Sequence, residues 1–127
     1  MASMQVELVS VERPIWSGEA VGVYGRTVAG ELGILPGHTP LFGALDPGHI
    51  IRIERENEDD LRVAVHGGFL SVRKEGVSVL AEMAETADEI DVGRARAALD
   101  SADPGTPEGA AARDRALARL RAAGESV

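Results

Sequence analysis

Apolar residues recur at every second position through most of the chain from Gln5 to about Ala84. An alternation of this kind is typical of β-strands that bury one face. Many short strands, with Gly-rich or charged turns between them, predict an antiparallel sandwich or a flattened barrel. The stretches that carry the pattern most clearly are Val6–Val11, Ala20–Tyr24, His49–Arg55, Leu61–Val65, Phe69–Arg73 and Val77–Ala81.

Two consecutive glycines, Gly67 and Gly68, separate two of these alternating stretches. We interpret them as a hairpin turn that closes Leu61–Val65 onto Phe69–Val72. The run H-G-G-F that includes them is also similar to the oxyanion loop of esterases. The chain has no G-x-S-x-G motif to supply the nucleophile, so the hairpin interpretation is favoured.

The pattern changes after Ala84, where alanine becomes frequent and β-branched residues become rare. Two segments, Asp88–Ala102 and Glu108–Ala123, have helical composition, and the breaker D-P-G-T-P separates them. Asp88 or Asp91 is expected to cap the first helix. We therefore predict a β-domain over residues 1–86 and a helical hairpin over 87–127. The apolar stripes of both helices are mostly alanine, so the hairpin should leave the β-domain at small cost.

Composition and charge exclude several classes of function. The chain has 127 residues and a formal net charge of −8, which disfavours binding to nucleic acid. It contains no cysteine, and no apolar run approaches the ~20 residues that a membrane-spanning helix needs. Its three histidines, His38, His49 and His66, lack the spacing of a helical metal site. We therefore expect no metal centre, no catalytic residues and no direct membrane insertion.

The segment from Gly30 to Gly48 is the most unusual part of the chain. It holds five glycines and three prolines, and its only charged residues are Glu31 and Asp46. Glycine and proline prescribe sharp turns, and the apolar residues between them must enter a core or meet a partner. An apolar, turn-shaped surface on an acidic protein commonly marks a protein–protein contact. The residues alone leave both explanations open.

A second candidate site lies where the helical composition begins. Asp91 and Arg94 are three positions apart on the first predicted helix, and Arg115 and Arg119 are four apart on the second. Asp91 and Arg94 could simply form a surface ion pair. Together with the two later arginines they could instead hold a phosphorylated nucleotide. The arginines of the second helix could also dock on an acidic partner.

Several motifs in order along the chain resemble the epsilon subunit of bacterial proton-translocating rotary ATP synthases, called delta in mitochondria. Each motif is weak alone, but the colinear set is specific, covers essentially the whole chain, and is most similar to the actinobacterial branch. The motifs are V-E-L-V-S-V-E near the start, I-W-S-G at Ile15–Gly18, G-E-L-G-I-L-P-G-H-T-P-L from Gly30, G-G-F-L-S-V at Gly67–Val72, V-S-V-L-A-E at Val77–Glu82, and I-D-x-x-R-A at Ile90–Ala95.

The resemblance implies a mainly β plus α fold, with a ten-stranded antiparallel β-sandwich followed by a two-helix hairpin. It implies a non-catalytic rotor subunit that couples proton translocation to ATP synthesis. The sandwich would contact the gamma subunit and the c-subunit ring, on the cytoplasmic side of the cell membrane as a peripheral protein. The residues that the resemblance places at this interface are Glu31, Gly33, Ile34, Leu35, Pro36, Gly37, His38, Pro40 and Leu41.

For the hairpin, the resemblance implies two positions. It either folds down on the sandwich or extends along gamma toward the alpha and beta subunits of the catalytic head and inhibits ATP hydrolysis. No cofactor is required, but some relatives bind regulatory ATP through the I-D-x-x-R-A motif. Asp91 and Arg94 match that motif, whereas Arg115 and Arg119 only approximate the arginines of the second helix. The alternative is a free-standing ligand-binding β-sandwich, such as a nucleotide or carbohydrate sensor.

Overall fold

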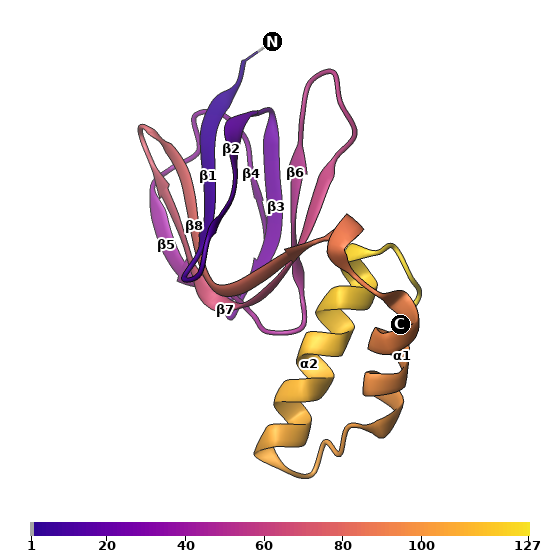
Figure 1. The fold of residues 1–127 in the computed structure, drawn as a ribbon. Helices are drawn as coiled ribbons and strands as arrows, with labels where there is room; N and C mark the ends of the chain where they lie inside the picture. Colours follow the sequence, from indigo (N-terminus) through magenta and orange to yellow (C-terminus); the bar gives the residue numbers. More distant parts are fainter. Residues whose placement is uncertain (1) are drawn as a thin grey trace.

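Eight β-strands occupy the chain from Met4 to Thr86, and a helical hairpin follows them (Figure 1). The computed structural model describes residues 2–127, so that Met1, the first residue of the predicted β-domain, lies outside the described residues. The strands are β1 (Met4–Ser10), β2 (Pro14–Ala20), β3 (Gly22–Thr27), β4 (Gly30–Ile34), β5 (Leu41–Ala44), β6 (Ile50–Glu54), β7 (Leu61–Arg73) and β8 (Gly76–Thr86).

The strands form a folded-over sheet in the order β2-β1-β8-β7-β6-β3-β4, with β5 attached to β7. The long strand β7 pairs with β6 through its first half and with β5 through its second half. It therefore passes from one layer of the sandwich to the other. Strands β1 and β8 run parallel, and the other strand pairs of the described chain are antiparallel. The predicted β-sandwich is confirmed. The expected ten antiparallel strands are not, because the described residues form eight strands and one strand pair is parallel.

The two glycines at positions 67 and 68 lie inside β7 and not in a hairpin turn, which corrects the sequence interpretation. Both have positive φ, 80° for Gly67 and 123° for Gly68. A Cβ on Gly68 would collide with the backbone carbonyl of Leu80 in the neighbouring strand. The carbonyl of Gly68 accepts a hydrogen bond of 2.9 Å from the amide of Leu45. Glycine is needed here because β7 bends while its neighbours stay close.

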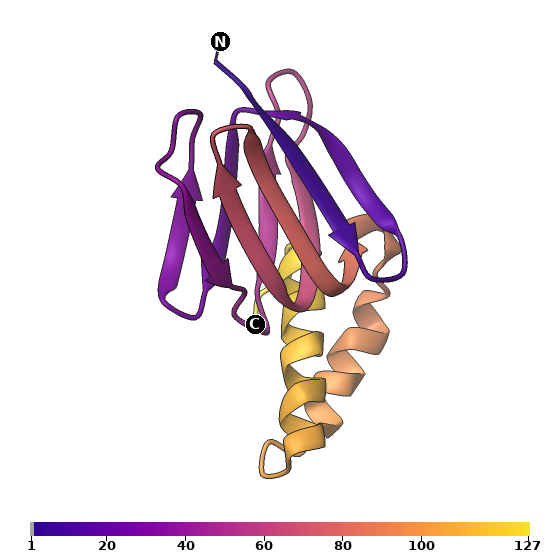
Figure 2. The same cartoon turned by 90° about the vertical axis from the view of Figure 1, so that its left-hand side faces the viewer.

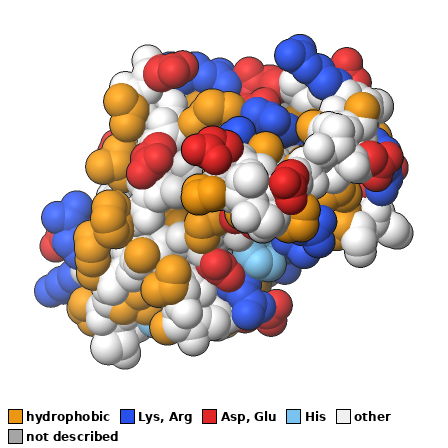
Figure 3. Space-filling view, turned by 90° about the horizontal axis from the view of Figure 1, so that it is seen from below, with side chains coloured by type: hydrophobic (Ala, Val, Ile, Leu, Met, Phe, Trp, Pro, Cys, Tyr) orange, Lys and Arg blue, Asp and Glu red, His pale blue; other side chains and the backbone are white. Residues whose placement is uncertain are grey.

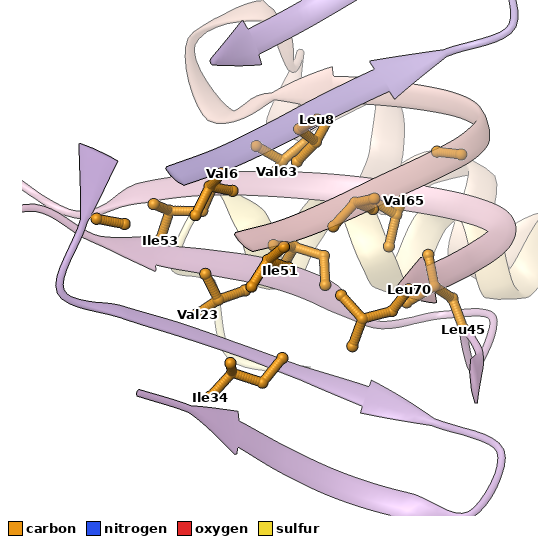
Figure 4. Close-up of a cluster of buried hydrophobic side chains, with 14 of the residues drawn as sticks. Val6, Leu8, Val23, Ile34, Leu45, Ile51, Ile53, Val63, Val65 and Leu70 are labelled. Atoms are coloured by element: carbon orange, nitrogen blue, oxygen red, sulfur yellow. The ribbon is translucent and has the colours of Figure 1, made fainter. Parts of the chain in front are cut away.

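The core of the sandwich consists of aliphatic side chains from the inner faces of both layers (Figure 4). In β6, for example, Ile51 and Ile53 are fully buried whereas Arg52 between them points outward. Burying one such side chain contributes about 1.5–3 kcal/mol. The labelled core residues are Val6, Leu8, Val23, Ile34, Leu45, Ile51, Ile53, Val63, Val65 and Leu70.

The helical part begins with the single 3-10 turn η1 (Ala87–Glu89), followed by α1 (Val92–Ser101) and α2 (Pro107–Ala122). The carboxylate of Asp91 caps α1 by accepting a hydrogen bond of 3.0 Å from the amide of Arg94. Thr106 caps α2 through the amide of Gly109, also at 3.0 Å. The predicted helices are confirmed, with α1 beginning later than expected because Asp91 and not Asp88 is its cap.

Helix α2 lies on the outer face of β7 and β6, and α1 packs against α2 (Figures 1 and 2). The contact between α2 and the sheet is a small cluster in which Ala118 and Ala122 meet Ala64 of β7. These three residues are at most 1% exposed, and Ile50 and Ile90 border them. The turn between the helices projects away from the sandwich (Figure 1). The apolar attachment of the hairpin is therefore narrow and made largely of alanine.

Candidate functional site

The loop between β4 and β5 holds most of the residues expected at a partner interface. Glu31 is exposed on β4, and the side chain of Leu35 is 54% exposed. The amide of His38 donates to the carbonyl of Leu35 at 3.1 Å, and Gly37 has a φ of 87°, so the loop makes a tight turn. Ile34 is only 1% exposed and supports the loop from within the core.

The residues of the β4–β5 loop share one hollow. Leu35 through Pro40 line a cavity of about 550 Å³ together with the β7–β8 turn and the first residues of β1. Gly33 is exposed beside Tyr24, whereas Leu41 is half-buried at the start of β5. The structure therefore gathers residues 35–40 into one concave surface and leaves Glu31 and Gly33 on the neighbouring sheet face.

An exposed apolar stripe, formed by Phe42, Phe69 and Leu80, lies on the outer face of β5, β7 and β8. These side chains are 68%, 48% and 53% exposed, respectively. The rings of Phe42 and Phe69 stack with their centroids 5.3 Å apart, and Phe69 is directly opposite Leu80. Seen from below, hydrophobic side chains gather on the left of the molecule, which is the side of β5 in Figure 1 (Figure 3).

Sequence reasoning left open whether Phe42, within the Gly30–Gly48 segment, meets a partner, and it did not assign Phe69 or Leu80 to an interface. The available signal was that β7 and β8 carry apolar residues on both faces near this point. In β7, Leu70 and Val72 already fill the core face, so Phe69 must point outward. Large exposed apolar side chains in a cluster indicate a surface that a partner covers.

The four residues considered for nucleotide binding do not all meet. Asp91, Arg94 and Arg119 line one cavity of about 420 Å³, whose wall also includes Glu85 and Glu89. Arg115 instead lines a separate cavity of about 460 Å³ beside His66 and Asp114. The Asp91 carboxylate accepts from the backbone of Arg94 and is not within ion-pair distance of its guanidinium. Arg94 lines this cavity and is exposed, and its guanidinium has no ion-pair partner in residues 2–127.

Between the sheet and α2, one carboxylate oxygen joins three elements. The Oε1 atom of Glu85 on β8 accepts a hydrogen bond from Nε2 of His66 on β7 and another from Nε of Arg119 on α2, both at 2.8 Å. Burial alone would raise the pKa of Glu85, but the hydrogen bonds from Arg119 and His66 outweigh it and lower that pKa. Burial lowers the pKa of His66 despite the hydrogen bond to Glu85.

A second ion pair fastens η1 to the sandwich. Nη2 of Arg13, in the β1–β2 turn, lies 2.7 Å from Oε1 of Glu89. The same carboxylate accepts from the backbone and side chain of Thr86. Hydrogen bonds from Arg13 and from the Thr86 amide lower the pKa of Glu89 to about 2. This junction ties the start of the hairpin to the β1–β2 turn by contacts that do not involve α2.

No group of three or more His, Cys, Asp or Glu side chains suited to hold a metal ion occurs in residues 2–127. Among the described residues, the imidazole of His38 forms its hydrogen bond with the carbonyl of Thr39, and that of His49 approaches Asp46 at 3.5 Å. No helix in this described part is long and apolar enough to cross a membrane.

Comparison with known proteins gives one consistent result. The family described as the β-sandwich domain of the ATP synthase delta/epsilon chain matches residues 3–87. The ATP synthase epsilon chain of Mycobacterium avium is 55% identical over 124 residues, which cover 98% of each chain. That of Mycobacterium tuberculosis is 53% identical with the same coverage.

Two solved structures show the same fold. A chain of the Euglena gracilis mitochondrial ATP synthase, solved with OSCP, F1 and the c-ring, superimposes with a TM-score of 0.75 and 27% identity. The match covers 98% of this chain and 83% of that one. A chain of the Tetrahymena thermophila central stalk and c-ring gives a TM-score of 0.59 at 17% identity, covering 94% and 92%. The resemblance seen in the sequence is confirmed, and this chain belongs to the delta/epsilon family of ATP synthase subunits.

Proposed function

We propose that this chain is the epsilon subunit of a rotary ATP synthase, a non-catalytic part of the rotor that couples proton translocation to ATP synthesis. The observation that carries the proposal is the similarity over 98% of both chains to proteins named ATP synthase epsilon chain. A free-standing ligand-binding sandwich is not favoured, because the similarity extends through the hairpin as well as the sandwich.

Residues 1–86 are proposed to dock the rotor parts. The hollow formed by residues 35–40 suits contact with loops of the c-subunit ring, and exposed Glu31 on β4 adds a charged group to the proposed contact. The apolar stripe suits the gamma subunit, because three large side chains in one patch need a protein surface to cover them. Such docking would place the chain peripherally at the cytoplasmic side of the cell membrane without inserting any part of it.

Residues 87–127 are proposed to regulate ATP hydrolysis. In this structure the hairpin is folded down, with α2 against β7. Its attachment consists of a few alanine contacts, the hydrogen bond from Arg119 to Glu85 and one from Arg121 to the carbonyl of Gly48, so its release exposes little apolar surface. A released hairpin would be free to extend toward the alpha and beta subunits of the catalytic head and to obstruct hydrolysis.

Regulatory ATP is proposed to bind beside the hairpin, in the cavity lined by Asp91, Arg94 and Arg119. Arg94, whose guanidinium has no ion-pair partner in residues 2–127, is available for a phosphate, whereas Arg119 would have to exchange Glu85 for the ligand. Isothermal titration with MgATP tests this site, with Arg94→Ala as the probe and exposed Arg113→Ala as the matched control. We expect heat of binding from the wild type and the control only; equal binding by all three would exclude the site.

Assembly with gamma is the direct test of the proposed function. We would co-express the chain with the gamma subunit of its source organism and isolate the complex on a tag carried by gamma. We expect the wild type to co-purify, Phe69→Ser to be depleted, and Val28→Ser to be retained. Val28 is a suitable control because it is 70% exposed and lies outside the stripe. Absence of a wild-type complex would overturn the proposal.

A further inference from the structure

One imidazole nitrogen at the junction of sandwich and hairpin has an unusual environment. His66 lies on the outer face of β7, and its side chain is only 7% exposed. Its Nε2 atom is 2.8 Å from the Glu85 carboxylate, so this nitrogen carries a hydrogen and donates it. Its Nδ1 atom is buried and has no hydrogen-bond partner among the described residues. The arrangement suits neutral histidine and does not suit the imidazolium ion.

The surroundings of His66 disfavour its doubly protonated, positively charged form. The ionisable groups that face it or line the adjoining cavity are Glu82 and Glu85 on β8, and Asp114, Arg115 and Arg119 on α2. Glu85 favours a positive charge on His66, whereas Arg115 and Arg119 oppose it. A proton on Nδ1 would also create a buried N–H without an acceptor among the described residues, which is unfavourable.

We propose that His66, Glu85 and Arg119 form a pH-sensitive latch, which holds the hairpin on the sandwich near neutral pH and releases it on acidification. Of the three residues, Arg119 lies on the hairpin, whereas His66 and Glu85 lie on the sandwich. The hydrogen bond from Arg119 to Glu85 therefore joins α2 to the sandwich and exists only while α2 is docked. Lifting α2 opens His66 to water and gives Nδ1 the partner that it lacks. The protonated histidine therefore favours the released hairpin.

The direction of the pH effect follows from the pKa values in the two positions of the hairpin. In the docked structure, burial lowers the pKa of His66 below its ordinary value of about 6.5. Its contribution to docking is then complete above about pH 6.5 and is lost as the pH falls toward the docked pKa. The pKa of Glu85 is also lowered, and its contribution is lost at still lower pH. Both groups make acid release the hairpin, and His66 responds first.

The latch deepens the proposed function, because its effect on ATP hydrolysis rests on the hairpin being inhibitory when released. In an acidified cytoplasm the released helices would become available to the catalytic head. The latch itself is a property of the isolated chain and can be measured without the rest of the enzyme.

The test uses two features of the composition, the single tryptophan and the absence of cysteine. Trp16 in β2 serves as the fluorescence donor, and an acceptor is attached to Ala97→Cys, which is exposed on α1. Energy transfer is followed from pH 8 to pH 5.5. We expect transfer to fall below about pH 6.5, with the docking equilibrium changing by up to tenfold per pH unit. A constant transfer in the wild type would overturn the proposal.

Variants of the three histidines identify which residue causes the change of energy transfer with pH. His66→Gln keeps a neutral donor for Glu85, so transfer should stay high at every pH, whereas His38→Gln should behave as the wild type. His49 also has a pKa lowered by burial and lies near Arg121, so His49→Gln is measured beside them. A response that survives in His66→Gln, or that His49→Gln alone removes, would contradict the latch.

Should His66→Gln fail to dock even at pH 8, NMR titration of the wild-type imidazoles decides the question. The latch requires the pKa of His66 to lie below about 6.5 in the full chain. A value at or above 6.5 would overturn it. Because both measurements use the isolated chain, they succeed or fail independently of assembly with gamma.

Discussion

Replacing Ala118 by leucine should release the hairpin without loosening the sandwich. Ala118 is 0% exposed, and it packs against Ala64, which is also 0% exposed. The larger side chain has no room, and overpacking of this kind costs about 1–3 kcal/mol. The methyl groups of Ala64, Ala118 and Ala122 together contribute only about 2 kcal/mol to docking, at about 0.8 kcal/mol each. The clash is therefore as large as the apolar part of the attachment.

A loss of about 1–3 kcal/mol corresponds to a shift of about 5- to 150-fold in the docking equilibrium. Amide hydrogen exchange, read separately for α2 and for β7, measures this shift. We expect faster amide exchange in α2 and unchanged amide exchange in β7. Ala97→Leu, the same substitution at an exposed position of α1, should leave both unchanged. The reasoning would be refuted if Ala118→Leu accelerated exchange equally in β7 and α2, or in neither.

Three further predictions concern single residues. Asp91→Ala removes the cap of α1 and should cost about 0.5–2 kcal/mol of helix stability, seen as faster exchange of the first α1 amides; unchanged exchange would argue against the cap. Arg13→Ala should return the pKa of Glu89 from about 2 toward its ordinary range, which carboxylate NMR measures. In the wild type, the contribution of the Arg13–Glu89 pair to stability is complete above the ordinary pKa range of glutamate and is lost as the pH falls toward 2. Gly68→Ala should lower the midpoint of thermal unfolding more than Gly37→Ala, because both have positive φ but only at Gly68 would a Cβ meet backbone; equal losses would contradict this.

The alternation of apolar residues was sufficient to predict the sandwich, because inward and outward side chains differ sharply in strands such as β6. It was not sufficient to count the strands. A Gly-Gly pair with positive φ serves a tight hairpin or a bend within one strand equally well, and only the neighbouring strands decide between them. Gly68 lies in a bend because β8 and Leu45 both remain hydrogen-bonded beside it. The parallel pairing of β1 with β8 joins distant segments that carry no local signal.

The candidate site was predictable to a similar extent. Asp91 and Arg94 are close in sequence, so a shared helix end could be inferred from spacing alone. The separation of Arg115 from Arg119 depends on how α2 lies across β7, which the helix sequence does not state. The contact of His66 with Glu85 depends on the register of β7 against β8. Neither contact has a sequence pattern that would reveal it without the fold.

The central claim is that this chain is a rotor subunit whose hairpin restrains ATP hydrolysis. The most direct measurement compares hydrolysis by the assembled ATP synthase containing the full chain with that containing a chain that ends at Glu89, which keeps the Arg13 ion pair. We predict that the shortened chain still assembles and that hydrolysis rises. Equal hydrolysis by the two assembled enzymes would contradict the regulatory role, and failure of the full chain to assemble would contradict the proposed function itself.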